Sequence, residues 1–108
     1  DYDRELALIA VVKQAEQELE VAVSGYGMNP DGESCEFAIV VADAWQGKGI
    51  ARRLMTLLME AAKARGFKIM EGTVLAANVP MPSLVERLGF SVQPIPDSPS
   101  VYAASREL

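Results

Sequence analysis

Apolar residues along the chain first follow a period of two and later a period near 3.6, and this change separates predicted strands from predicted helices. The first three apolar segments are rich in Val, Ile, Leu and Phe. The second alternates with polar neighbours, and the third has Phe37, Ile39 and Val41 on one face. We therefore predict strands over residues 5–13, 17–26 and 34–42, the first two as an antiparallel pair. The Gly, Asn, Pro and Asp residues at 27–32 predict the turn before the third strand.

A helical period begins after residue 49 and predicts an amphipathic helix that stops at Gly66. Strand character returns over residues 67–75, and a short helix is predicted from Pro80 or Pro82 to Leu88. The tail from residue 90 to 108 predicts two weaker strands that prolines interrupt. The apolar stripe of the first helix is predicted to consist of Ile50, Leu54, Leu57, Leu58 and Ala61.

This order of elements predicts an α+β fold with one mixed sheet. The strand, helix and strand between residues 34 and 75 should form a right-handed crossover whose strands are parallel. Ligands in such sheets bind where the carboxyl end of a strand meets a helix N-terminus, here residues 43–51. The 108 residues suffice for a single domain, 1–108, with one modest core.

Composition excludes several classes of function. With 10 Lys and Arg against 15 Asp and Glu, the net charge of −5 has the wrong sign for a nucleic-acid partner. The absence of His excludes His triads and His-containing metal sites, so a general base must be a carboxylate or a weaker group. The single cysteine leaves no thiolate cluster for a metal and is typical of a reducing compartment. Because the sequence also has no apolar run of roughly 18 residues and no signal peptide, we expect a cytoplasmic protein without a membrane segment.

The turn before the first helix has the chemistry of an anion site. Gly47 and Gly49 remove side chains where a ligand would approach the backbone, and successive N–H groups at the helix start point to one place. Lys48 and Arg52 add positive charge beside them. The alternative is a glycine-rich turn that only closes the chain, since the segment is neither a Walker A loop nor a dinucleotide fingerprint.

Two motifs resemble those of the GNAT acetyltransferases. Gln46-x-x-Gly49-x-Ala51, between an apolar strand and an amphipathic helix, is similar to the family signature Gln/Arg-x-x-Gly-x-Gly/Ala. Asn78, followed by a short helix that ends in Leu-Gly-Phe at residues 88–90, is similar to a second family motif. The resemblance spans roughly residues 6–108. Residues 1–5 and 35–38 resemble in particular the acetyltransferase domain of bacterial protein lysine acetyltransferases that act on acyl-CoA synthetases.

The resemblance implies a GNAT-type, mostly antiparallel mixed sheet and acetyl-CoA as the cosubstrate. The backbone of Ile39 and Val41 would pair with the pantetheine arm, and Asn78 would contact the cofactor where the central strands separate. In the alternative interpretation, Ile39 and Val41 are core residues and Asn78 caps a helix. The pyrophosphate would be held by the amides of Gln46, Gly47, Lys48, Gly49, Ile50 and Ala51, with Arg52 nearby.

Acetyl transfer to an amine requires a base near neutral pH, and Glu36 is the candidate. It matches the glutamate that serves several protein acetyltransferases of the family, acting through a water, and strand alternation puts small Ala38 on the same face. The alternative is a glutamate that only faces solvent, in which case Glu71 or Glu33 would be the base. A covalent route through Cys35 is disfavoured, because nothing nearby in sequence would lower its pKa.

The sequence departs from the family in two respects. Val85 stands where many members carry a Tyr that protonates the leaving thiolate, so the thiolate would either leave unassisted or take its proton from water. The strand and helices that usually precede the position of Leu6 do not occur, which suggests a piece of a longer chain. We expect another domain or a homodimer to complete the acceptor site.

Three hypotheses for the function remain. The acceptor would be a protein lysine, as on an acyl-CoA synthetase, or a small amine. In the third hypothesis, the chain is a cofactor sensor without catalysis.

Overall fold

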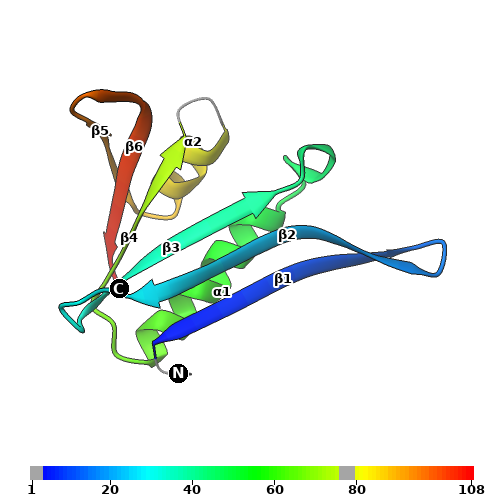
Figure 1. Ribbon diagram of the computed structural model, residues 1–108, viewed down its shortest axis with the longest axis horizontal. Helices are drawn as coiled ribbons and strands as arrows, with labels where there is room; N and C mark the ends of the chain where they lie inside the picture. The colour runs from blue at the N-terminus through cyan, green and yellow to red at the C-terminus, as the bar shows by residue number, and fades with distance from the viewer. Residues whose placement is uncertain (1–3, 76–79) are drawn as a thin grey trace.

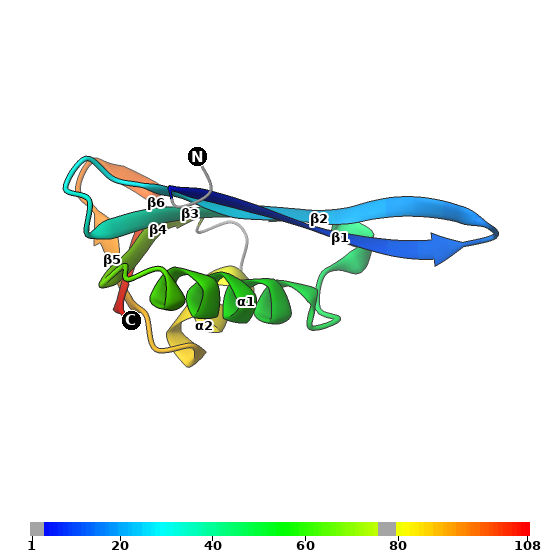
Figure 2. The ribbon, with the colours of Figure 1, turned by 90° about the horizontal axis from the view of Figure 1, so that it is seen from below.

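A single mixed sheet carries two α-helices on one face, as Figures 1 and 2 show for the computed structural model, which describes residues 4–75 and 80–108. The strand order is β1-β2-β3-β4-β6-β5, and only β3 and β4 are parallel. The predicted α+β architecture with one parallel strand-helix-strand unit is therefore confirmed. The elements are β1 Glu5–Gln14, β2 Gln17–Met28, β3 Ser34–Val41, α1 Ile50–Ala64, β4 Ile69–Leu75, α2 Pro80–Arg87, β5 Ser91–Ile95 and β6 Ser98–Glu107.

The predicted start of β4 at Phe67 is wrong, and the reason lies in how α1 ends. Gly66 adopts a left-handed φ of 91°, and its N–H donates to the Lys63 carbonyl. The Phe67 N–H then reaches back to the carbonyl of Ala62. This pattern satisfies the last carbonyls of the helix, so Phe67 belongs to the helix-ending turn and the strand begins at Ile69.

The core lies between the sheet and α1, and it corrects one member of the predicted helical stripe. Leu54 and Leu58 are buried as predicted, but Leu57 is 42% exposed. Successive residues of a helix are about 100° apart around its axis, so Leu57 lies at the margin of the buried side, which is centred on Leu58. Met55 and Ala62, both fully buried, take its place against the sheet.

Strands β3 and β4 separate soon after they begin to pair. Their register covers only Ser34 to Glu36 on β3, opposite Ile69 to Glu71 on β4. Beyond that point β3 pairs only with β2, whereas β4 continues beside β6. Figure 1 shows the two strands diverging from this common start. The sheet therefore has an opening between β3 and β4 that widens toward the carboxyl end of β3.

Phe37 occupies the base of this opening because Gly72 leaves room for it. A Cβ built on Gly72 would lie 2.6 Å from a carbon of the Phe37 ring. That ring is buried and packs edge-on against Phe90, with 5.5 Å between ring centroids. Gly72 is thus the residue that lets an aromatic side chain lie flat against β4.

Gly72→Ala should lower the free energy of unfolding by about 1–3 kcal/mol, the usual cost of overpacking a core. Urea denaturation measures the change. Gly27→Ala is the matched control, because Gly27 also lies in a strand but a Cβ there would meet nothing within 4 Å. We expect the control to change stability by no more than about 0.5 kcal/mol. Equal losses in both variants would disprove the packing explanation.

Strands β1 and β2 extend beyond the rest of the sheet as a two-stranded arm, defined here as residues 11–20. Pairing of β2 with β3 begins only at Ala22, so the arm residues of β2 pair with β1 alone. Figure 1 shows the arm projecting past the other strands. Its terminal turn contains Ala15 and Glu16, with φ values of 50° and 66°.

Candidate functional site

A cavity of about 430 Å³ lies at the carboxyl end of β3, where the sequence placed the anion site. The turn after β3, the first turn of α1 and the length of α2 form its walls. Val41, Gln46, Gly47, Gly49, Ala51 and Arg52 line the cavity, as do Trp45, Met81, Ser83, Leu84 and Arg87. Ile39, Lys48 and Ile50 are not among the lining residues, and Asn78 lies outside the described residues.

The side chain of Gln46 connects the turn after β3 to the end of that strand through hydrogen bonds. Its Nε2 donates to the Val41 carbonyl at 3.2 Å and to Oδ1 of Asp43 at 3.3 Å. A short 3₁₀ turn, Asp43–Trp45, precedes it. Lys48 Nζ lies 5.9 Å from the centroid of the Trp45 ring, within the range of a cation–π contact. Gln46 therefore holds the turn in place, which gives its side chain a positioning function.

Six consecutive backbone N–H groups, from Gly47 to Arg52, donate no hydrogen bond to any described residue. Gly49 precedes the helix with φ 85° and provides no side-chain cap, and the first helical bond runs from the Arg53 N–H to the Gly49 carbonyl. The Gln46 N–H already donates to Asp43, at 3.3 Å. The free donors thus begin at Gly47, one residue later than the predicted set.

These donors fit a pyrophosphate. A Cβ built on Gly47 or Gly49 would meet no atom within 4 Å, so both glycines border open space rather than packed atoms. Both have positive φ, which L side chains rarely adopt. Free N–H groups at a helix N-terminus favour anionic oxygens, and Arg52 lines the same cavity. Acceptor oxygens of a phosphate would satisfy what the chain leaves unpaired.

The backbone of Ile39 and Val41 is directed toward the opening between β3 and β4. Ala42 donates its N–H to Val21 on β2, whereas the Glu33 carbonyl accepts from Lys68 just before β4. Backbone groups alternate sides along a strand, so odd-numbered residues of β3 face β4. Because β4 has diverged there, Ile39 and Val41 have no strand partner on that side, although the Val41 carbonyl accepts a hydrogen bond from the Gln46 side chain. A ligand could add to β3 as a strand would.

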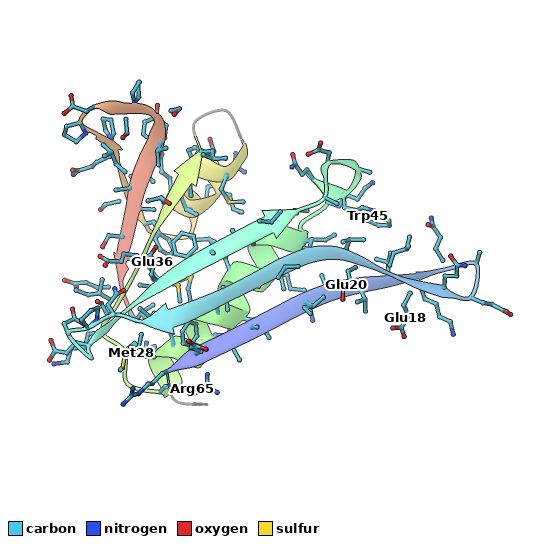
Figure 3. All side chains as sticks on the ribbon, in the orientation of Figure 1. Glu18, Glu20, Met28, Glu36, Trp45 and Arg65 are labelled. Atoms are coloured by element: carbon cyan, nitrogen blue, oxygen red, sulfur yellow. The ribbon has the colours of Figure 1, made fainter. Side chains whose placement is uncertain are left out.

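Glu36 lies at the other end of β3, on the sheet face opposite the helices (Figure 3). It is exposed together with Ala38, as the alternation predicted. Across β2 its partner is Gly27, so backbone rather than side chain forms the floor beside it. The groove that it borders has a volume of about 520 Å³ and is lined by Glu5, Leu6, Ala7, Gly25, Tyr26, Gly27, Glu36 and Ala38.

The two reserve glutamates are engaged elsewhere. Glu71 accepts a hydrogen bond from Asn29 Nδ2 at 2.9 Å, and Glu33 pairs with Lys68 at 3.4 Å. Glu36 accepts none from the described residues, although it lies directly beside Glu71 in the sheet register. Of the three carboxylates, Glu36 is therefore the one without a hydrogen-bond or ion-pair partner among the described residues.

Cys35 is unsuited to covalent catalysis. Its side chain is fully buried, and Sγ lies 3.7 Å from the Ile69 carbonyl, to which it donates. Burial raises the pKa of the Cys35 thiol to about 11, and the nearby carboxylate of Glu71 adds to the rise. Because only the thiolate is a competent nucleophile, the residue is inert near neutral pH.

Val85 is completely buried, so the position that differs from the family motif serves the core. Five cavity residues escaped the sequence analysis: Trp45, Met81, Ser83, Leu84 and Arg87. The spacing of Met81, Leu84 and Leu88 could have signalled an amphipathic face on α2. What the sequence did not reveal is that this face meets the turn before α1, some 35 residues earlier in the chain.

Two structural findings concern the excluded classes of site. Within residues 4–75 and 80–108, no three Cys, Asp or Glu side chains gather in a way that could hold a metal ion. In the same part of the chain, neither helix has the length and apolar character needed to cross a bilayer.

Comparison with known proteins identifies relatives in sequence. The model of the acetyltransferase (GNAT) family matches residues 3–90. An acetyltransferase of Pseudomonas aeruginosa is 36% identical over 97 residues, which cover 90% of this chain and 52% of that protein. The chain thus spans about half the length of this curated relative.

Solved structures share the fold. The GNAT domain of PAT from S. lividans superposes with a TM-score of 0.81 at 22% identity, covering all of this chain and 63% of that one. YncA from Salmonella typhimurium, determined with its cofactor acetyl-CoA, superposes with a TM-score of 0.65 at 24% identity, covering 83% of this chain and 58% of that one.

Proposed function

We propose that this chain, which belongs to the acetyltransferase (GNAT) family, forms the cofactor-binding core of an acetyl-CoA-dependent N-acetyltransferase. The observation that carries the proposal is the row of unpaired N–H donors from Gly47 to Arg52 at the wall of the cavity. These amides and Arg52 would hold the pyrophosphate. The backbone of Ile39 and Val41 would bind the pantetheine arm, apart from the Val41 carbonyl, which already accepts from Gln46. The proposal also includes a contact between Asn78 and the cofactor, as the sequence predicted.

The remaining chemistry is assigned to Glu36. Bound acetyl-CoA supplies an activated acyl group in the form of a thioester. Glu36 takes the proton of the incoming ammonium through a water, which leaves the amine nitrogen free to attack the carbonyl carbon. The new N–C bond replaces the C–S bond. The proton that the nitrogen loses as it becomes an amide passes through water to the departing thiolate, because Val85 offers no proton. Glu36 borders the face of the sheet that the described helices leave open, so an acceptor can approach it.

The proposed acceptor is the ε-amine of a protein lysine, as on an acyl-CoA synthetase. The groove beside Glu36 supports a lysine side chain, because Gly25 and Gly27 leave its floor flat and Glu5 and Glu36 supply negative charge. The net charge of −5 favours a cationic partner. A small amine such as a polyamine would meet the same groove and is the second candidate.

The part of the active site that binds the acceptor amine would be completed by residues beyond those of this chain. The chain spans about half of its Pseudomonas relative, so a further domain or a second copy would cover the open face beside Glu36. We propose that residues 1–108 form one domain of this larger enzyme, in the cytoplasm.

Incubation with radiolabelled acetyl-CoA and two acceptors, an acyl-CoA synthetase and a polyamine mixture, tests the function. We expect label on the synthetase, and mass spectrometry should locate it on lysine. Label on polyamine alone would identify a small-molecule enzyme instead. Tight binding of acetyl-CoA with label on neither acceptor would contradict catalysis and favour a sensor, whereas an absence of binding would refute the cofactor site itself.

A further inference from the structure

The cavity is more cationic than one anion-binding turn requires. Arg52 enters it from the first turn of α1, and Arg87 enters it from the last turn of α2. No Asp or Glu is among the described residues that line the cavity, although acidic residues outnumber basic ones by 15 to 10 in the chain. Two arginines on separate helices thus line a single cavity, and the described residues that line it with them include no carboxylate.

A purely structural explanation for Arg87 is incomplete. Cations near the end of a helix interact favourably with its dipole, and Arg87 is in the last turn of α2. However, Arg106 already lies beside that end, because its Nε is 2.7 Å from where a Cβ of Gly89 would be. Arg87 makes no ion pair with the described residues, and its side chain instead borders the cavity.

We propose that Arg87 binds the 3′-phosphate on the ribose of coenzyme A and thereby selects coenzyme A over its dephosphorylated form. This inference rests on the proposed function. The pyrophosphate is provided for by the amides from Gly47 to Arg52, whereas the additional phosphate of coenzyme A needs a cation of its own. A guanidinium can pair with a phosphate through two parallel hydrogen bonds.

The cavity wall also has the chemistry of an adenosine site. Trp45, Met81 and Leu84 give it apolar and aromatic surface, and Ser83 adds a hydroxyl group. The adenine ring of coenzyme A could lie against the apolar residues. The pyrophosphate would then reach Arg52, and the 3′-phosphate of the ribose would reach Arg87. The two helices would therefore hold the nucleotide at two separate charges.

Calorimetric titration with coenzyme A and with 3′-dephospho-coenzyme A tests the inference on four proteins: the unchanged chain, Arg87→Gln, Arg87→Lys and Arg53→Gln. The unchanged chain should bind coenzyme A roughly tenfold more tightly than the dephosphorylated form. Arg87→Gln should abolish this preference by weakening coenzyme A alone, and Arg87→Lys should restore part of it. Arg53→Gln is the control, because Arg53 borders only the outer groove of α1 and should keep the preference.

The outcomes separate the two proposals. Equal affinity of the unchanged chain for both compounds, or equal losses for both in Arg87→Gln, would overturn the role of Arg87 and leave the cofactor site standing. Failure of the unchanged chain to bind either compound would refute the proposed function together with this inference. Circular dichroism melts establish that each variant is folded before it is titrated.

Discussion

Glu36→Gln should slow acetyl transfer to an amine by about 10²- to 10⁴-fold, the usual cost of losing a general base. Affinity for acetyl-CoA should stay nearly unchanged, because the proposed cofactor contacts lie at the other end of β3 and in the turn beyond it. Steady-state kinetics with a lysine substrate measures the first quantity, and calorimetry measures the second.

The deficit of Glu36→Gln should shrink as pH rises. A lysine amine has a pKa of about 10.4, so more substrate then arrives already deprotonated and the base becomes dispensable. Glu20→Gln on the β1–β2 arm removes the same charge from an exposed strand position and should leave turnover intact at every pH. Full activity of Glu36→Gln at neutral pH would transfer the role to Glu71 or to a base outside the chain. Loss of cofactor binding would mean that Glu36 supports the strand.

Gly49→Asp should weaken acetyl-CoA binding by about tenfold or more, because it places a carboxylate among N–H donors meant for phosphate oxygens. Gly49 has φ 85°, and a Cβ there would enter the open space beside the donors. Calorimetry measures the effect. Lys48→Ala should do less, since an exposed charge beside a backbone-built site contributes modestly.

Two controls separate charge from backbone strain in the Gly49 experiment. Gly49→Asn has nearly the same size and the same left-handed backbone but no charge, so it should bind acetyl-CoA better than Gly49→Asp. Gly66→Asp introduces comparable strain at φ 91°, beyond the far end of the same helix, and should lower stability without lowering affinity. Unchanged affinity in a folded Gly49→Asp protein would remove the phosphate site from this turn.

Alternation and helical spacing predicted most of the fold because each element buries one face against a single core. The predicted bounds of β1, β2 and β3 agree with the structure to within two residues. The start of β4 was wrong because hydrogen bonds that end a helix leave no mark in hydropathy, and Phe67 is apolar in either role. The assignment of Leu57 to the buried face of α1 was wrong, because a stripe of apolar residues does not by itself reveal where the centre of the buried face lies.

The site was predictable where the chemistry lies in consecutive residues, and only there. The turn from Gln46 to Ala51 carries its glycines within one segment, so its place and conformation could be inferred from the sequence. Arg87 and Trp45 line the same cavity only because α2 lies beside the turn. Likewise, the hydrogen bond from Asn29 that engages Glu71, and so distinguishes it from Glu36, joins residues 42 positions apart.

The β1–β2 arm must be the least cooperative part of the sheet. Its residues have a partner on one side only, and an isolated two-stranded ribbon is marginally stable in water. Ala15 and Glu16 add backbone strain of the order of 1 kcal/mol each, because neither is a glycine and both adopt left-handed φ. The arm can therefore fray and reclose while β2 beyond Ala22 stays paired, so its amide hydrogens exchange with solvent through local opening rather than through global unfolding.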